Sequence, residues 1–384
     1  MMIEGAGELD RVARVTSPTL SRAVTPVVQE RVPVILRATR LEARGARMRV
    51  GGLRVVDRAI RQLGRLRDVN VVIATDGSIP LPRRLPPNMD RRELDGDAEG
   101  AIERLRAQLG PQVLVASADG VWLQPARFDR ATRIVDAASR RLAERDVYRE
   151  AQKATAGLVD RAINQRVSAW LTRMLFARLP IAPALITLAA GFIGLYGALM
   201  IAPGGHANVL NGFLVLEGSL LLDGCAGELA RVRLHQTALG AWLDTVVGDF
   251  VNIVMVLAVG MALWRHGGTY LDMKMAAASA GLTLFYAVVS YRELIRQRQG
   301  DVLKLRWWFA YGQSLRAMGG AGASHIKAIT LLGRRDVVVA LGIGLAVADQ
   351  LPVVALYMLI IALVRAAAAL GQILTPEWRL RPPA

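Results

Sequence analysis

Two acidic side chains, Asp223 and Asp244, lie within long apolar stretches of the sequence. A carboxylate in such surroundings is costly and usually serves a function. Small or charged residues accompany both acids at four-residue steps, so each set lies along one face of a helix. The residues with this spacing are Asp223, Gly227, Arg231, Gly240, Asp244 and Gly248. Two acidic helix faces that meet would offer oxygen ligands to a hard divalent cation.

This stretch resembles the pattern D-x2-D-G-x2-A-R-x8-G-x3-D-x3-D of the CDP-alcohol phosphotransferases. Asp223 takes the first acidic place and Asp244 takes the third. The alanine-arginine pair and the second glycine also stand at the spacing of the pattern. Two acidic places are lost, because Ala226 stands in the second and Gly248 in the fourth.

The resemblance implies a role for each matching residue. In that family, divalent ions held by the aspartates bind the pyrophosphate of a CDP-linked donor, and the last aspartate deprotonates the attacking alcohol. We therefore expect a weakened Mg2+ or Mn2+ site at Asp223 and Asp244. The general base is missing, because Gly248 stands in its place. Asp249 is the candidate substitute, but it lies five residues after Asp244 and is therefore turned away from the helix face that carries Asp244. The donor-binding residues implied by the alignment are Gly227, Ala230, Arg231 and Gly240.

A second pair of charged residues, Arg334 and Arg335, precedes an apolar segment. The pair resembles a basic entry in the inositol-phosphate branch of the family, where it helps to hold an anionic substrate. The same residues also suit a positive flank at the cytoplasmic membrane face. The distribution of basic residues predicts an inner-membrane protein with both termini and the mouth of the site on the cytoplasmic side.

The composition separates a polar front from an apolar remainder. The chain has 384 residues, of which 53% are hydrophobic, and a formal net charge of +16. Charged residues concentrate before about residue 178, which predicts a water-soluble portion joined to a membrane portion. No nucleic-acid module is visible, and basic residues that flank membrane spans explain the positive charge more simply. The single cysteine, Cys225, excludes an intramolecular disulfide framework.

The pattern divides the chain into five parts. They are a lead-in (1–30), an α/β domain (31–128), a helical linker with an amphipathic juxtamembrane helix (129–180), a membrane domain of six transmembrane helices (181–376) and a tail (377–384). The six apolar segments are 184–202, 207–229, 241–264, 273–291, 336–350 and 352–374, each near the length that crosses a bilayer. Of these, 336–350 is the shortest.

In the front part, three strands at 32–36, 68–75 and 112–119 alternate with helices, which predicts a small parallel α/β unit. This order resembles the front of a sugar-phosphate nucleotidyltransferase, in which a glycine-rich loop after the first strand cradles a triphosphate. Here the loop 37–45 has lost nearly all its glycines, and bulky side chains obstruct the backbone N–H groups. Asp119 is either a vestigial metal ligand or a turn cap. We interpret the domain as degenerate, with a structural or regulatory role.

The resemblance is closest to the fused branch that joins an inositol-phosphate cytidylyltransferase to a di-inositol phosphate phosphate synthase. It implies a homodimeric membrane enzyme that transfers a phosphoalcohol group from a CDP-linked donor, of the CDP-diacylglycerol or CDP-inositol type, to an alcohol or lipid acceptor and releases CMP. The lost carboxylates leave an alternative from another class. This alternative is a catalytically inactive relative that binds a ligand or partners an intact paralogue. A transporter has little support beyond the spans.

Overall fold

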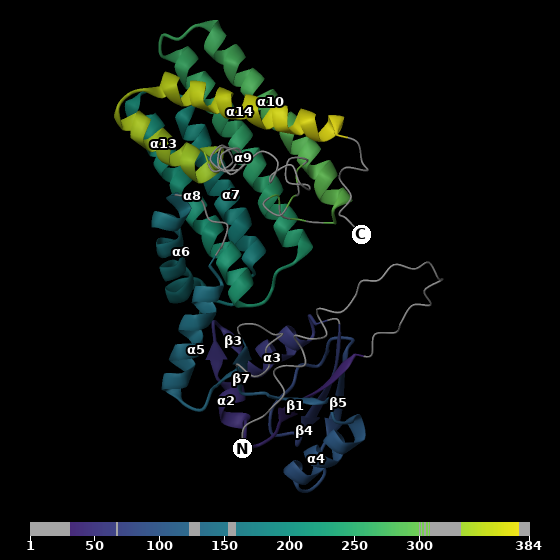
Figure 1. Ribbon diagram of the computed structural model, residues 1–384. Helices are drawn as coiled ribbons and strands as arrows, with labels where there is room; N and C mark the ends of the chain where they lie inside the picture. The colour runs from purple at the N-terminus through teal and green to yellow at the C-terminus, as the bar shows by residue number, and fades with distance from the viewer. Residues whose placement is uncertain are drawn as a thin grey trace, which may run out of the picture.

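The computed structural model of the protein describes residues 31–66, 68–122, 131–152, 159–298, 300, 302, 305, 307 and 332–375. A parallel α/β domain comes first and a bundle of long helices follows it (Figure 1). The predicted lead-in (1–30) and tail (377–384) lie outside the described residues.

The central sheet of the front domain has four parallel strands in the order β5-β4-β1-β6. The three predicted strands correspond to β1 (Val32–Ala38), β4 (Val69–Thr75) and β6 (Leu114–Ser117). The sequence prediction missed β5 (Met89–Glu93), because four of its five residues are charged. Such a strand suits the edge of a sheet, where charge discourages pairing with other chains.

Helices cover both faces of this sheet. Val34 and Leu36 of β1 pack with the buried side of α3 (Val55–Leu63), whereas Ile35 packs with α4 (Ala98–Leu109). Successive side chains of a strand point to opposite faces, so β1 contributes to two apolar layers. The smaller elements of the domain are α2 (Ala43–Arg47), β2 (Arg49–Val50), β3 (Leu53–Arg54), β7 (Gly120–Trp122) and β8 (Ala131–Arg133).

A series of helices connects the front domain to the bundle along one side (Figure 1). Their order is α5 (Ala137–Glu150), η2 (Asp160–Asn164), α6 (Gln165–Leu171) and η3 (Thr172–Phe176). Asp136 caps the N-terminus of α5 and exchanges capping hydrogen bonds with Ser139. The predicted amphipathic helix covers α6 and η3, and it exposes large apolar side chains such as Trp170 and Met174.

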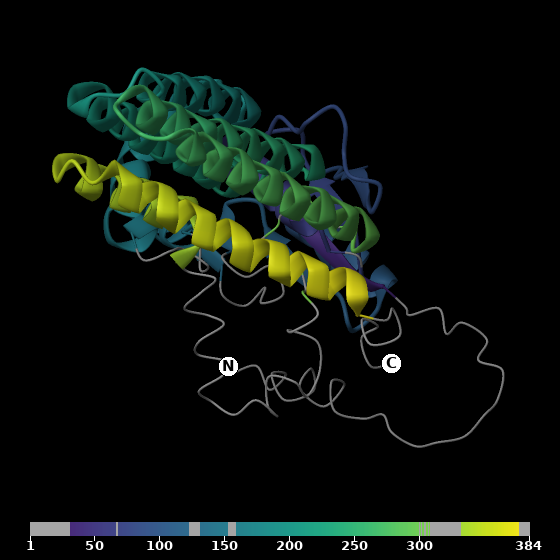
Figure 2. The same cartoon turned by 90° about the horizontal axis from the view of Figure 1, so that it is seen from above.

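Five helices of the described part of the chain are long and apolar enough to cross a membrane. They are α7 (Pro183–Ile201), α8 (His206–Val232), α9 (Ala238–Arg265), α10 (Tyr270–Arg296) and α14 (Leu351–Leu374). Figure 2 shows the long helices side by side, with α14 next to α10. Large apolar side chains on their outer surfaces are exposed, among them Phe192 of α7 and Leu363 of α14. This exposure is expected for helices that face lipid.

The predicted set of exactly six spans is not confirmed. The segment 336–350 forms α13 (Arg335–Val347), which has 13 residues. At 1.5 Å per residue it is about 20 Å long, whereas the hydrocarbon core is about 30 Å thick. α13 packs on α8, where Gly342 lies against the buried ring of Phe213. Its first residue is Arg335, so this short helix brings a predicted site residue toward α8.

The two domains meet at the C-terminal end of α8, where three arginines of the α3 region donate hydrogen bonds to main-chain carbonyls. The pairs are Arg58 with Val232 (2.5 Å), Arg61 with Arg233 (2.9 Å) and Arg65 with Leu234 (2.7 Å). Cations stabilise the negative end of a helix dipole. Burial lowers the pKa of Arg58 to about 10, so its guanidinium stays charged at neutral pH. The front domain is thus bound directly to the helix that carries Asp223.

Candidate functional site

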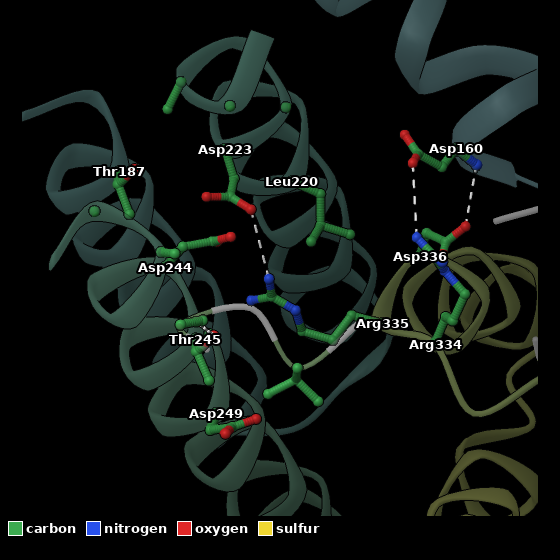
Figure 3. A pocket seen from close by; sticks show the side chains of 18 of the residues that line it. Asp160, Thr187, Leu220, Asp223, Asp244, Thr245, Asp249, Arg334, Arg335 and Asp336 are labelled. Carbon is green, nitrogen blue, oxygen red and sulfur yellow. Dashed lines mark hydrogen bonds and ion pairs between the residues drawn. The ribbon is translucent and has the colours of Figure 1, made fainter. Parts of the chain in front are cut away.

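A cavity of about 1140 Å³ lies among the linker helices and α7, α8, α9, α10, α13 and α14. Asp223 of α8 and Asp244 of α9 both point into it (Figure 3). The structure brings every residue predicted for the site to this one cavity. They are Asp223, Gly227, Ala230, Arg231, Gly240, Asp244, Gly248, Asp249, Arg334 and Arg335.

Arg335 enters the cavity from the start of α13 and pairs with Asp223. Its Nη2 atom lies 3.6 Å from Asp223 Oδ2 (Figure 3). The two side chains are 31% and 23% exposed, so both remain accessible from the cavity. The positively charged guanidinium of Arg335 therefore lies beside Asp223, one of the two predicted metal ligands.

Gly248 makes room for this guanidinium. A β-carbon added at Gly248 would lie 2.8 Å from Arg335 Nη1 and 2.9 Å from its Cζ. Side-chain atoms do not approach a β-carbon so closely, so any larger residue would displace the guanidinium. Where the family pattern has its fourth aspartate, this chain has the side chain of an arginine from another helix.

The second lost acid, at Ala226, has a different environment. Ala226 is 2% exposed and packs with Ile186 and Leu229 in an apolar cluster. Ala226 also lines the same cavity as Asp223 and Arg231, so it borders both the apolar cluster and the cavity. The apolar neighbours fit the alanine that stands in the second acidic place.

These residues do not fit a pair of divalent ions. In the described part of the chain, no group of three or more His, Cys, Asp or Glu side chains could hold a metal ion. The guanidinium beside Asp223 adds repulsion of about 4 kcal/mol per unit charge at 4 Å and an effective dielectric constant of 20. The Mg2+ or Mn2+ ion at Asp223 and Asp244 stays a prediction.

Asp249 lines the same cavity as Asp244, and Figure 3 shows both on α9. The Tyr291 hydroxyl donates a hydrogen bond to Asp249 Oδ2 over 2.9 Å. The offset between the two acids on the helix does not remove Asp249 from the cavity, because the cavity extends along α9 and reaches α10. Asp249 is therefore a carboxylate that a bound alcohol could meet.

The residues predicted to bind the donor lie where α8 ends and α9 begins. Arg231 donates from Nε to the carbonyl of Ala151 over 2.5 Å, and its guanidinium lies against Gly227. The Gly240 N–H donates to Thr237 Oγ1 over 3.0 Å, which caps the first turn of α9. Arg231 thus links this end of the cavity to the linker, and Gly240 follows a helix start.

Several residues of the cavity were missed by sequence reasoning. Arg334 lies 3.8 Å from Asp160 and 3.3 Å from Asp336, and the Asp160 N–H donates to Asp336 Oδ2 over 3.0 Å. Asp336 belongs to the same short sequence as the predicted arginine pair, but its contact with Asp160 was not predicted, because Asp160 lies far away in the sequence. Tyr286 of α10 stacks on Trp307, and the Arg365 guanidinium lies 5.4 Å from the Tyr286 ring centre.

The loop after β1, predicted to be a degraded phosphate loop, holds a carboxylate of its own. Glu42 is fully buried, and its Oε2 accepts hydrogen bonds from Thr39 N–H (3.0 Å) and Thr39 Oγ1 (2.6 Å). Its Oε1 lies 2.6 Å from Arg37 Nε. The Glu42 carboxylate therefore already accepts the hydrogen bonds that Thr39, directly after β1, could offer to a phosphate.

Asp119 and Gly45 also have structural partners. Asp119 Oδ2 lies 3.0 Å from Arg133 Nη2, and Ser117 donates a hydrogen bond to Asp119 Oδ1 over 2.6 Å. The hydrogen bond to Asp119 raises the pKa of Arg133. A β-carbon at Gly45 would lie 1.8 Å from the carbonyl oxygen of Ile134, so this glycine permits close packing. These contacts favour the structural interpretation of the front domain.

Fold and cavity together define a protein in which a parallel α/β domain precedes apolar helices that enclose carboxylates and arginines. The chain is similar to the bifunctional IPC transferase and DIPP synthase of Aquifex aeolicus, with 26% identity over 35% of this chain and 30% of the relative. The proteins of the same name from Thermococcus kodakarensis and Archaeoglobus fulgidus share 30% and 25% identity, over 32% and 27% of this chain and 28% and 20% of their own lengths.

The aligned part thus spans less than a third of each of these curated relatives. No protein-family profile matches the chain. The three relatives confirm the predicted resemblance to the fused IPC transferase and DIPP synthase branch.

Proposed function

We propose that this protein transfers a phosphoalcohol group from a CDP-linked donor to an alcohol acceptor within the membrane and releases CMP. The observation that carries the proposal is the cavity between α8 and α9, into which Asp223 and Asp244 both point. The similarity to the bifunctional IPC transferase and DIPP synthases supports the same class of reaction.

In the proposed reaction, the acceptor hydroxyl oxygen forms a bond to the phosphorus atom of the phosphoalcohol group. The bond between that phosphorus and the oxygen of CMP breaks, and CMP leaves with the electron pair. Asp249 accepts the hydroxyl proton, since it lines the cavity and is oriented by Tyr291. Arg334 and Arg335 offset the phosphate charge, and Gly227 and Gly240 allow the donor to approach the backbone.

The test is CMP release by purified protein from CDP-diacylglycerol and CDP-inositol, each with an alcohol acceptor. Loss of a positioned general base costs 100-fold to 10,000-fold, so the Asp249→Asn variant should release CMP at least about 100 times more slowly. Asp90→Asn, on the exposed edge strand β5, is the matched control and should keep the full rate. No release above the Asp249→Asn level from either donor would refute the transferase.

A second function is favoured by one observation, the arginine side chain that lies over Gly248. It is the inactive relative, which would bind a phosphate-bearing ligand without turnover and act as a membrane partner protein. This function requires saturable binding of CDP together with absence of CMP release, so the same preparation separates the two.

The topology and the assembly remain predictions. We propose an inner-membrane homodimer whose cavity opens to the cytoplasm together with both termini. Accessibility of introduced surface cysteines to a membrane-impermeant reagent, in intact cells and in inverted vesicles, tests the orientation.

A further inference from the structure

The guanidinium of Arg335 stands in the part of the cavity that a carboxylate at Gly248 would share with Asp223. Its Nη2 atom lies 3.6 Å from Asp223 Oδ2, and its Nη1 atom lies 2.8 Å from where a β-carbon at Gly248 would stand. α13 is held in this position by its packing on α8, where Gly342 contacts Phe213. The location of the positive charge is therefore set by the fold and by the absence of a side chain at Gly248.

An arginine differs from a metal ion in ways that matter for a ligand. Its guanidinium stays protonated under all ordinary conditions and carries five N–H donors in a planar fork. Such a fork matches the oxygens of phosphate groups and often binds them through two hydrogen bonds. One carboxylate oxygen of Asp223 orients the group without using all of its donors, and the side chain is 31% exposed.

We propose that Arg335 replaces a divalent cation in this cavity, so that the protein binds a phosphate or pyrophosphate group without any metal ion. Gly248 admits the guanidinium, Asp223 orients it, and the phosphate oxygens take the remaining donors. The inference rests on the proposed function only in taking the class of ligand from it. Binding of this ligand requires no turnover.

The experiment measures binding of inorganic pyrophosphate and of CDP to the full-length purified protein, by calorimetry in EDTA and in excess Mg2+. Both probes should bind in EDTA, and Mg2+ should change their affinities by less than about threefold, allowing for its own complex with pyrophosphate. Arg335→Gln should weaken binding in EDTA at least about tenfold, the loss typical of a charge-assisted hydrogen bond. Arg265→Gln, at the end of α9 outside the cavity, is the matched control.

Two variants of Gly248 test the geometry independently of Arg335. Gly248→Ala adds a β-carbon that displaces the guanidinium and should weaken metal-free binding several-fold. Gly248→Asp adds a carboxylate that also competes with phosphate for the guanidinium, so its loss in EDTA should be larger. Mg2+ should restore part of that loss only in Gly248→Asp, because only this variant gains a third acid near Asp223 and Asp244.

The results separate this inference from the transferase. Arg335-dependent binding of pyrophosphate in EDTA supports the inference, whether or not CMP is released from any donor. Binding that requires Mg2+, binding that is unchanged in Arg335→Gln, or no binding of either probe in EDTA overturns it. The transferase would still stand in each of these outcomes if CMP were released.

Discussion

Internal charges fill two positions where the family pattern would place ligands or ions. In the front domain, the carboxylate of Glu42 accepts the hydrogen bonds of Thr39 that a phosphate loop would offer to a nucleotide. In the helical bundle, the guanidinium of Arg335 occupies space beside Asp223. The Glu42 carboxylate carries the same sign of charge as a phosphate, and in the proposed binding site the Arg335 guanidinium carries the same sign of charge as a divalent cation. Thr39 therefore keeps a hydrogen-bond acceptor, and Asp223 keeps a positively charged partner.

The first prediction concerns Glu42. Replacement by Gln removes the charge but keeps the shape, and it leaves Arg37 and Thr39 without their anionic partner. Breaking a buried ion pair costs 3–5 kcal/mol, and because the Arg37 side chain is 26% exposed we expect a smaller loss of about 2 kcal/mol. Thermal unfolding of the purified protein, followed by circular dichroism, should show a lower midpoint for Glu42→Gln.

The control is Glu103→Gln on α4, where the side chain is 70% exposed and its pair with Arg106 spans 3.7 Å. An exposed pair of this kind contributes at most about 1 kcal/mol, so the control should unfold near the wild-type midpoint. Equal midpoints for Glu42→Gln and the wild type would show that the buried carboxylate is not needed to hold the loop.

At the scale of elements, α13 determines where Arg335 lies. Gly342 and Gly344 are two residues apart on this helix but face different surroundings. A β-carbon at Gly342 would lie 2.4 Å from the nearest ring atom of Phe213, whereas a β-carbon at Gly344 would meet nothing within 4 Å. Since Phe213 is fully buried, its ring has little space to move.

The second prediction compares alanine at these two glycines. Gly342→Ala overpacks the contact with α8 and should lower the free energy of unfolding by about 1–3 kcal/mol. Gly344→Ala should leave it unchanged or raise it by up to about 1 kcal/mol, because alanine favours helix more than glycine does. Pyrophosphate affinity should fall in Gly342→Ala alone, since α13 carries Arg335. Equal stability and affinity in the two variants would contradict the packing argument.

Local sequence patterns determined which helices and strands could be predicted. β1, β4, α4 and the long apolar helices have clear periodicity or length, and the sequence located them. β5 was missed because its charged residues resemble a loop, and a strand of this kind is recognisable only once its neighbour β4 is in place. The predicted fifth span, 336–350, was apolar but too short, and its role in packing on α8 has no signal in the local sequence.

The candidate site was predictable along α8 and α9 and not beyond them. Spacing on a helix placed Asp223, Asp244 and the intervening glycines on surfaces that could meet. The contact between Gly248 and Arg335 joins residues far apart in the sequence, so no local pattern shows it. The same reason hid Asp160, whose interaction with Arg334 joins the linker to the start of α13 at the cavity.

For the whole molecule, the contact between the domains gives the front domain a role without nucleotide binding. The arginines of the α3 region bind carbonyls at the end of α8, and Val232 of α8 packs among Val50 and Val55 of the front domain. Arg58 also donates to the carbonyl of Val50, so one buried guanidinium connects both sides. Loosening this contact should first affect the last turn of α8, which ends nine residues beyond Asp223 and one beyond Arg231.

The last prediction is that Arg58→Met loosens the end of α8. The substitution keeps an apolar stem of similar length but leaves the carbonyls of Val232 and Val50 without this donor, at a cost of about 1–3 kcal/mol. Hydrogen exchange measured by mass spectrometry should then show about tenfold or faster exchange in a peptide covering residues 229–235. Arg106→Met, on the exposed side of α4, should leave that peptide unchanged. Equal protection in wild type and Arg58→Met would mean that the front domain does not stabilise α8, and its role would have to be sought in another contact.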